Sequence, residues 1–215
     1  MKSVLITGGT VRLGVVIAER LKADGWRVLT SSHRADAGAD VVADLSAPGG
    51  AVKLYSAALQ ILGGNPPDAL VNNAALFTGD AAAIAAVNLE SPKKLTMLMA
   101  GRETGIGAIV NILDTKALDA YRRLSTPIDA YLASKLALLD FTRSAAATFA
   151  ATLRVNAVAP GPVLAPTEVH VKAGETLLAR RPTPDDVAAA VAYLLGAEST
   201  TGAIIPVDAG QHLIR

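Results

Sequence analysis

Apolar and polar stretches alternate along the whole chain, and the apolar stretches are of two kinds. Short unbroken runs, such as residues 4–6, are typical of strands buried on both faces of a parallel sheet. Longer stretches with apolar residues at helical spacing, such as residues 15–23, predict amphipathic helices. The short runs predict strands over residues 4–6, 27–32, 39–44, 68–74, 108–113, 153–159 and 202–207. The longer stretches predict helices over residues 15–23, 50–62, 81–100, 127–151 and 184–195.

This alternation of strands and helices predicts an α/β fold. We expect a Rossmann-type, doubly wound parallel sheet of about seven strands with helices on both faces. No internal repeat, linker or low-complexity tail interrupts the pattern, so residues 1–215 are expected to form a single domain. Ligands of such sheets bind at the carboxyl ends of the strands. Chemistry is therefore expected where each strand ends.

The first strand end carries a glycine-rich turn, Thr7-Gly8-Gly9-Thr10-Val11-Arg12-Leu13-Gly14. A helix that begins after such a turn presents unpaired backbone N–H groups and the positive end of its dipole, which together bind anions. The strand over residues 27–32 then closes a βαβ unit of about 30 residues, the size used for dinucleotides. The turn therefore predicts a dinucleotide phosphate site. Its expected cofactor contacts are Gly8, Thr10, Arg12, Leu13 and Gly14.

Composition excludes several other classes of function. The net charge is +1, with 20 basic and 19 acidic residues spread along the chain, so no basic stripe for nucleic acid is present. The apolar runs are shorter than the ~20 residues that cross a bilayer, and the chain enters a strand at once without a signal segment. We therefore expect a cytoplasmic protein without a membrane segment. The absence of cysteine excludes disulfides and zinc–thiolate sites, and no metal site is expected.

Tyr131 and Lys135 lie four residues apart in the helix predicted over residues 127–151, so they share one face. An ammonium near a phenol favours the phenolate, which predicts that Lys135 lowers the tyrosine pKa from its reference of ~10. Such a tyrosine can pass a proton to a substrate, and the lysine can also hydrogen-bond a ribose. With the glycine-rich turn, this pair resembles the short-chain dehydrogenases/reductases, and the resemblance covers essentially the whole chain.

Four positions resemble the pteridine reductase branch of that family. Arg12 stands where the wider family carries glycine, and Asp114 follows the strand over residues 108–113 where the wider family carries serine. His33-Arg34 follows the second strand, and Phe77 lies in the loop after the fourth. The resemblance implies that Asp114 orients Tyr131, that Phe77 stacks on a pterin ring and that Arg12 also contacts substrate. Asp114 as a cap of the next turn and Phe77 as a core residue remain alternatives.

Arg34 also predicts the cofactor. NAD-specific proteins place an acid at this strand end, whereas a cation can hold a 2′-phosphate by two charge-assisted hydrogen bonds, which predicts NADP(H). His33 assists or only caps the strand end, and a solvated surface arginine is the alternative. Ala35 stands where pteridine reductases often have a serine. The resemblance implies further cofactor contacts from Asp44, Asn73, Ala74, Tyr131, Lys135, Pro160, Gly161 and Val163.

The same resemblance implies the remaining roles. Asn88 would hold a water molecule for the proton relay, and residues 164–181 would form a substrate lid. The tail after residue 206 resembles that of dihydromonapterin reductases, and its His212 serves interface packing or substrate contact. A homodimer or homotetramer is implied, formed through the helices that follow the fourth and fifth strands.

We therefore expect a small-molecule reductase. Hydride would pass from NADPH to a C=N bond of a dihydropterin, dihydromonapterin or dihydrofolate ring, with Tyr131, Lys135 and Asp114 delivering the proton. Asp114 argues against the second interpretation, an NADPH-dependent reductase of 3-oxoacyl groups or small ketones. The third is a catalytically silent NADP(H)-binding sensor, against which the intact Tyr131 and Lys135 argue.

Overall fold

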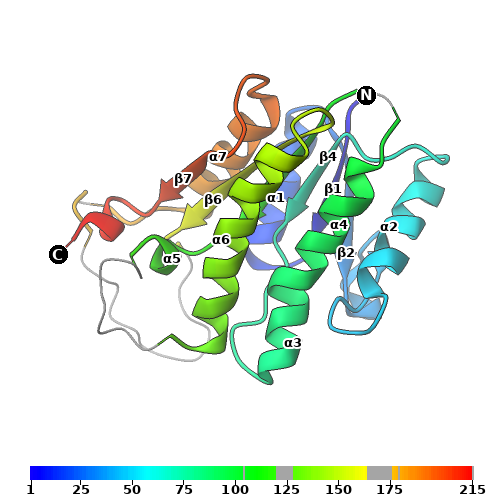
Figure 1. Cartoon of the computed structure of the whole chain (residues 1–215). Helices are drawn as coiled ribbons and strands as arrows, with labels where there is room; N and C mark the ends of the chain where they lie inside the picture. Colours follow the sequence, from blue (N-terminus) through cyan, green and yellow to red (C-terminus); the bar gives the residue numbers. More distant parts are fainter. Residues whose placement is uncertain (104, 120–127, 164–175, 179, 215) are drawn as a thin grey trace.

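The computed structural model describes residues 1–103, 105–119, 128–163, 176–178 and 180–214 (Figure 1). The strands are β1 (Ser3–Thr7), β2 (Arg27–Ser32), β3 (Val41–Val42), β4 (Ala69–Asn72), β5 (Gly107–Ile112), β6 (Leu153–Pro160) and β7 (Ile204–Val207). The α-helices are α1 (Arg12–Ala23), α2 (Gly50–Ile61), α3 (Ala81–Ala85), α4 (Ser91–Ala100), α5 (Thr115–Asp119), α6 (Ala130–Thr148) and α7 (Pro184–Gly196). Two 3-10 turns, η1 (Ala35–Ala37) and η3 (Gln211–Leu213), and one π-helical turn, η2 (Ala86–Glu90), complete the described elements.

The strands form one parallel sheet in the order β3-β2-β1-β4-β5-β6-β7. The predicted doubly wound α/β fold is confirmed. Chain order runs outward from β1 in one direction as far as β3, then resumes on its other side with β4. In such sheets the ligand crevice lies where this reversal occurs, at the carboxyl ends of the strands. Here that place is the edge of the sheet formed by the ends of β1 and β4.

Helices cover both faces of the sheet (Figure 1). Alternate residues of each buried strand point to opposite faces, so both faces are apolar and both need to be covered. Val4 and Ile6 of β1 pack in one apolar cluster with residues of α1 and α7. Leu5 packs on the other face, in a cluster that contains residues of α2 and α4. The apolar runs therefore form two cores, one on each face of the sheet, and these fix the strand ends that carry the site.

Several elements differ from their prediction. The third strand is only Val41–Val42, and side-chain bonds hold the segments around it: the Asp40 carboxylate accepts the Thr30 N–H at 2.7 Å, and Asp44 accepts the Ser46 N–H at 2.8 Å. The helix predicted over residues 81–100 contains the π-helical turn between α3 and α4. Helix α5 was not predicted, and the Asp114 carboxylate accepts the Lys116 N–H in its first turn.

Helix α6 begins where Asp129 caps it, since this carboxylate accepts the Leu132 N–H at 2.7 Å. It ends at Thr148, so the observed helix is slightly shorter at both ends than the helix predicted over residues 127–151. None of the helices in the described ranges is long and apolar enough to span a bilayer.

Candidate active site

A cavity of about 490 Å³ opens at the carboxyl edge of the sheet. Its walls come from the turn after β1, the ends of β2, β4, β5 and β6, and the start of α6. All but one of the residues predicted for the site line this cavity. Those that line it are Gly8, Thr10, Arg12, Leu13, Gly14, His33, Arg34, Asp44, Asn73, Ala74, Phe77, Asp114, Tyr131, Lys135, Pro160, Gly161 and Val163. The exception is Asn88.

The glycine-rich turn has the shape and the free donors of an anion site. Gly14 has no alternative, because a Cβ there would lie 2.0 Å from the Gly8 carbonyl oxygen. Val11 is the N-cap of α1 and makes no side-chain cap bond. No capping side chain therefore accepts a hydrogen bond from the N–H groups of the first helical turn. The Thr10 hydroxyl oxygen is buried without a hydrogen-bond partner among the described residues. These groups fit the pyrophosphate of a dinucleotide.

Asn73 fixes this turn from the neighbouring strand end. Its amide nitrogen donates to the carbonyl oxygens of Thr7 and Gly8, both at 3.0 Å. The Thr7 hydroxyl in turn accepts the N–H groups of Asn73 and Ala74, each at 3.0 Å. Asn73 therefore orients the phosphate turn, and the cavity wall at the β1–β4 crevice is held by four hydrogen bonds rather than by packing alone.

Arg34 has a partner that the sequence reasoning did not include. Its Nε and Nη2 donate to the two carboxylate oxygens of Asp36, at 3.0 and 2.7 Å. Both side chains are well exposed, and exposed pairs of this kind contribute little stability. An anion arriving at Arg34 therefore competes with Asp36 for the guanidinium. The signal was present in the sequence, since an acid stands two residues after the arginine.

Asp44 lines the cavity near the end of β2. One of its oxygens accepts both the N–H and the hydroxyl of Ser46, at 2.8 and 2.6 Å. The Ser46 hydroxyl, followed by the Ser46 N–H, lowers the pKa of the Asp44 carboxyl. Asp44 is therefore an ionised hydrogen-bond acceptor at the cavity wall.

Tyr131 and Asp114 meet directly. The Tyr131 hydroxyl donates to Oδ2 of Asp114 at 2.8 Å, and Oδ1 of Asp114 accepts the Lys116 N–H at 2.9 Å. Both interpretations of Asp114 therefore hold in one side chain, which caps the next turn with one oxygen and orients the tyrosine with the other. The short helix α5 is what lets a residue after β5 do both.

The pKa of Tyr131 is raised in this arrangement, not lowered as predicted. The Lys135 ammonium donates to the carbonyl oxygen of Ile112 at 2.8 Å and lies 5.7 Å from the centre of the Tyr131 ring. Burial raises the pKa of Tyr131, and the charge of Asp114 and its hydrogen bond raise it further. Tyr131 is therefore a neutral phenol, which is suited to donating a proton.

Lys135 itself is almost fully buried. Burial lowers its pKa to about 8, although the Asp114 charge acts in the opposite direction. Its ammonium is therefore close to its titration midpoint in mildly alkaline solution. The Ile112 carbonyl, which lines the cavity and holds this lysine, could not be found from the sequence pattern because every strand end offers such a carbonyl.

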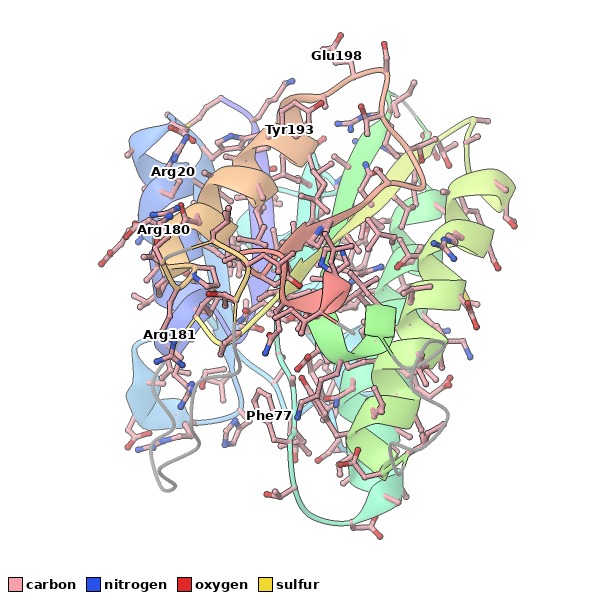
Figure 2. All side chains as sticks on the ribbon, turned by 90° about the vertical axis from the view of Figure 1, so that its left-hand side faces the viewer. Arg20, Phe77, Arg180, Arg181, Tyr193 and Glu198 are labelled. Atoms are coloured by element: carbon pink, nitrogen blue, oxygen red, sulfur yellow. The ribbon has the colours of Figure 1, made fainter. Side chains whose placement is uncertain are left out.

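Phe77 stacks on Tyr131 instead of lying alone in its loop. The ring centres are 4.9 Å apart at an interplanar angle of 30°, and 61% of the Phe77 surface is exposed. This exposure rules out the core alternative. Figure 2 places Phe77 at the opposite end of the molecule from Glu198, which follows α7. The cavity therefore has an aromatic wall beside the tyrosine hydroxyl.

Asn88 is the one predicted residue that does not line the cavity. Its amide nitrogen donates to the Leu76 carbonyl at 2.9 Å and the Ser134 hydroxyl at 3.0 Å, and its oxygen accepts the Leu76 N–H at 2.8 Å. This arrangement does not fit the expected water-holding role, because both amide hydrogens are used inside the protein. Asn88, in the π-helical turn η2, instead anchors the loop that carries Phe77.

The loop after β6 forms the remaining wall. The Gly161 N–H donates to the Val207 carbonyl at 3.0 Å, and the Val163 N–H donates to the Gly161 carbonyl at 2.8 Å. The lid was predicted over residues 164–181, and of these the structure describes only residues 176–178, 180 and 181. Most of the predicted lid therefore lies outside the described residues. Across the described part of the chain, no group of three or more His, Cys, Asp or Glu side chains could hold a metal ion.

Burial of Lys135 predicts a pH-dependent stability. The unfolded lysine keeps its proton up to its ordinary pKa of 10.5, whereas the folded one loses it at about 8. The folded state therefore gains stability as pH rises through this window. We expect the unfolding free energy of the wild type, minus that of Lys135→Met, to rise by up to about 3 kcal/mol from pH 8 to 10.5.

Urea unfolding followed by circular dichroism at several pH values measures this difference. Lys22→Met, an exposed lysine of α1, is the control and should give a curve parallel to the wild type. A difference between the wild type and Lys135→Met that stays constant with pH would contradict the assigned cause.

Comparison with known proteins adds three results. A family model described as enoyl-(acyl carrier protein) reductase matches residues 12–212. Galactitol 2-dehydrogenase of Rhizobium johnstonii is 35% identical over 91% of this chain and 84% of that protein. The NADP-dependent (R)-specific alcohol dehydrogenase of Lentilactobacillus kefiri is 28% identical over 97% and 96%.

A crystal structure of FolM alternative dihydrofolate reductase 1 from Brucella canis, complexed with NADP, superposes with a TM-score of 0.86. It is 32% identical in sequence, and the match covers 100% of this chain and 95% of that one. The similarity therefore extends over the length of the chain.

Proposed function

The chain belongs to the short-chain dehydrogenase/reductase family, and from this premise we propose that it uses NADPH to reduce a C=N bond of a dihydropterin-type ring. The observation that carries the proposal is the 2.8 Å hydrogen bond between Tyr131 and Asp114, next to the exposed ring of Phe77. A flat, polar, bicyclic substrate uses an aromatic face, and its ring nitrogen needs a proton donor beside that face.

The residues of the cavity fit NADP(H). The turn from Gly8 to Gly14 would hold the pyrophosphate, with the free Thr10 hydroxyl as one donor. Arg34 and His33 would hold the 2′-phosphate, and Asp44 the adenine. When bound, NADPH supplies the hydride. The complexes of similar proteins with NADP support this assignment.

The proton comes from the chain itself. Tyr131 donates it from its hydroxyl to the ring nitrogen, while the adjacent ring carbon receives the hydride, so that C=N becomes CH–NH. Asp114 orients the hydroxyl through Oδ2 before the transfer, and Lys135 places positive charge over the ring of Tyr131. That charge stabilises the phenolate left after proton transfer.

The test is NADPH oxidation at 340 nm with purified protein and a panel of substrates. Dihydrobiopterin and dihydromonapterin should be reduced, and dihydrofolate is the related ring to compare with them. Acetoacetyl thioester represents carbonyl substrates. Oxidation with the thioester alone would overturn the ring substrate and leave the cofactor assignment standing. NADPH binding without turnover of any substrate would favour a silent nucleotide-binding sensor.

A second candidate is an NADPH-dependent carbonyl reductase of 3-oxoacyl groups or small ketones. It is favoured by the relatives themselves, since the two curated ones named above are dehydrogenases of a polyol and of an alcohol. Asp114 argues against it, because an ionised carboxylate cannot donate a hydrogen bond to a ketone oxygen. We also propose a cytoplasmic location and, as the family resemblance implies, a homodimer or homotetramer.

Arg34→Ala is expected to raise the KM for NADPH at least tenfold and to change the KM for NADH little. The reason is that a bidentate, charge-assisted contact to the 2′-phosphate contributes about 1.5–3 kcal/mol, and NADH has no such phosphate. Initial rates against each cofactor measure the effect.

The matched control for this measurement is Arg20→Ala. Arg20 of α1 forms a similar exposed pair with an aspartate, Asp24, but does not line the cavity (Figure 2). It should leave both KM values unchanged. Equal rises of both KM values in Arg34→Ala would mean that Arg34 does not recognise the 2′-phosphate.

A further inference from the structure

One buried carboxylate plays no part in the proposed reaction. Asp208 follows β7 and is only 2% exposed. Its Oδ2 accepts the Thr115 hydroxyl at 2.5 Å and the His212 N–H at 2.8 Å, and lies 2.8 Å from Nδ1 of His212. Its Oδ1 accepts the Gly210 N–H at 3.0 Å. Burial acts to raise the pKa of Asp208, but the bonds from Thr115 and His212 together outweigh it and lower the pKa.

We propose that Asp208 is a positioning residue, which orients the catalytic Asp114 through Thr115. The inference rests on the proposed function only in calling Asp114 catalytic. Thr115 directly follows Asp114 and begins α5, so the bond from its hydroxyl to Asp208 fixes the backbone next to Asp114. The Lys116 N–H then holds Oδ1 of Asp114, and Oδ2 is left facing Tyr131.

The geometry makes this bond hard to replace. Thr115 is 5% exposed, so solvent cannot take the place of either partner. Helix α5 has only five residues and gains little rigidity from its own hydrogen bonds. Its first turn therefore depends on bonds from outside the helix, and Asp208 provides the one that comes from the far end of the sequence.

Asp208 also contacts a second wall of the cavity. A Cβ at Gly161 would lie 2.7 Å from the Asp208 Cβ, so the two backbones pack closely. The Ala209 carbonyl accepts the Leu178 N–H at 3.0 Å, which ties the end of the segment after β6 to the same tail. His212 is therefore used within its own chain, as the partner of Asp208, rather than only at an interface or on substrate.

Thr115→Val tests the link, because valine keeps the volume and removes the hydroxyl. The kcat for the dihydropterin should fall about tenfold, while the dissociation constant for NADPH, measured by its fluorescence, stays within twofold. Thr115→Ser restores the hydroxyl and should restore kcat. A merely structural loss would also weaken NADPH binding or lower the urea midpoint in proportion, and serine would not correct it.

A second measurement needs no substrate. Tyrosine labelled with ¹³C at Cζ reports the hydrogen bond of each phenol, and Tyr131→Phe identifies the signal of Tyr131. Thr115→Val should shift or broaden that signal, and Thr115→Ser should not. Thr96→Val is the control. Thr96 is another buried threonine, but its hydroxyl donates to the Pro92 carbonyl within α4, and α4 contributes nothing to the cavity.

The two measurements separate the two proposals. A Tyr131 signal that responds to Thr115→Val in a protein that reduces no pterin would retain the positioning role and overturn the substrate. Normal pterin reduction, with neither kcat nor the Tyr131 signal changed in a folded Thr115→Val protein, would overturn the positioning role. If Thr115→Val does not fold, Asp208→Leu, which keeps a similar volume and removes both oxygen acceptors, is measured in the same way and should show the same two losses.

Discussion

Tyr131→Phe is expected to lower kcat for dihydropterin reduction by about 10²–10⁴-fold, the range typical for loss of a general acid. Phenylalanine keeps the ring that stacks on Phe77 and removes only the hydroxyl that donates to Asp114. NADPH binding should therefore stay within about twofold, because Tyr131 donates no hydrogen bond to the phosphate turn. Single-turnover oxidation at 340 nm and a fluorescence titration with NADPH measure the two quantities.

Tyr193→Phe is the matched control. Tyr193 lies on α7, is 60% exposed, and lies away from Phe77 (Figure 2). It should give wild-type rates. If Tyr131→Phe keeps more than about a tenth of the wild-type rate, another group donates the proton, and the mechanism proposed here fails at its central step.

Asp114 variants should change which substrate is used. Asp114→Asn keeps an oxygen for the Lys116 N–H but turns an amide NH₂, which cannot accept a hydrogen bond, toward the Tyr131 hydroxyl, so kcat for the pterin should fall by about 10²-fold. Asp114→Ser places a hydroxyl donor after β5, which suits a ketone oxygen. We expect the ratio of kcat/KM for acetoacetyl thioester to that for the pterin to rise at least about tenfold.

Asp140→Asn, an exposed aspartate of α6, should leave this ratio unchanged. The Asp114→Asn protein should also have a lower Tyr131 pKa than the wild type, because the Asp114 charge and hydrogen bond both raise it. A ratio that is the same in Asp114→Ser and in the wild type would mean that this residue does not select between C=N and C=O substrates.

The sequence predicted the features that depend on local pattern. The parallel sheet and the crevice at the carboxyl ends of its strands follow from the spacing of apolar residues, as with Val4, Leu5 and Ile6. The turn and the four-residue spacing of Tyr131 and Lys135 predicted part of the cavity, and the resemblance to the family supplied other residues, such as Asp44 and Asn73. Such positions are fixed as soon as the strands pair.

The features that were not predicted depend on which side chain reaches which atom. Lys135 bonds a backbone carbonyl, that of Ile112, and no residue type marks such a partner in the sequence. The π-helical turn contains Asn88, which bonds Leu76 of the preceding loop, and no local pattern marks that contact. Asp208 is ninety-three positions from Thr115, a contact that no local pattern contains.

The strand order has a consequence for how the protein is made. After β4, each new strand of the chain adds to the same outer edge, beside the strand that was synthesised just before it. A chain leaves the ribosome from its N-terminus. The residues of the nucleotide turn after β1 thus emerge long before those of the last strand. Asp208 comes after that strand, so the residue that we propose to position the proton donor is among the last parts of the domain to emerge.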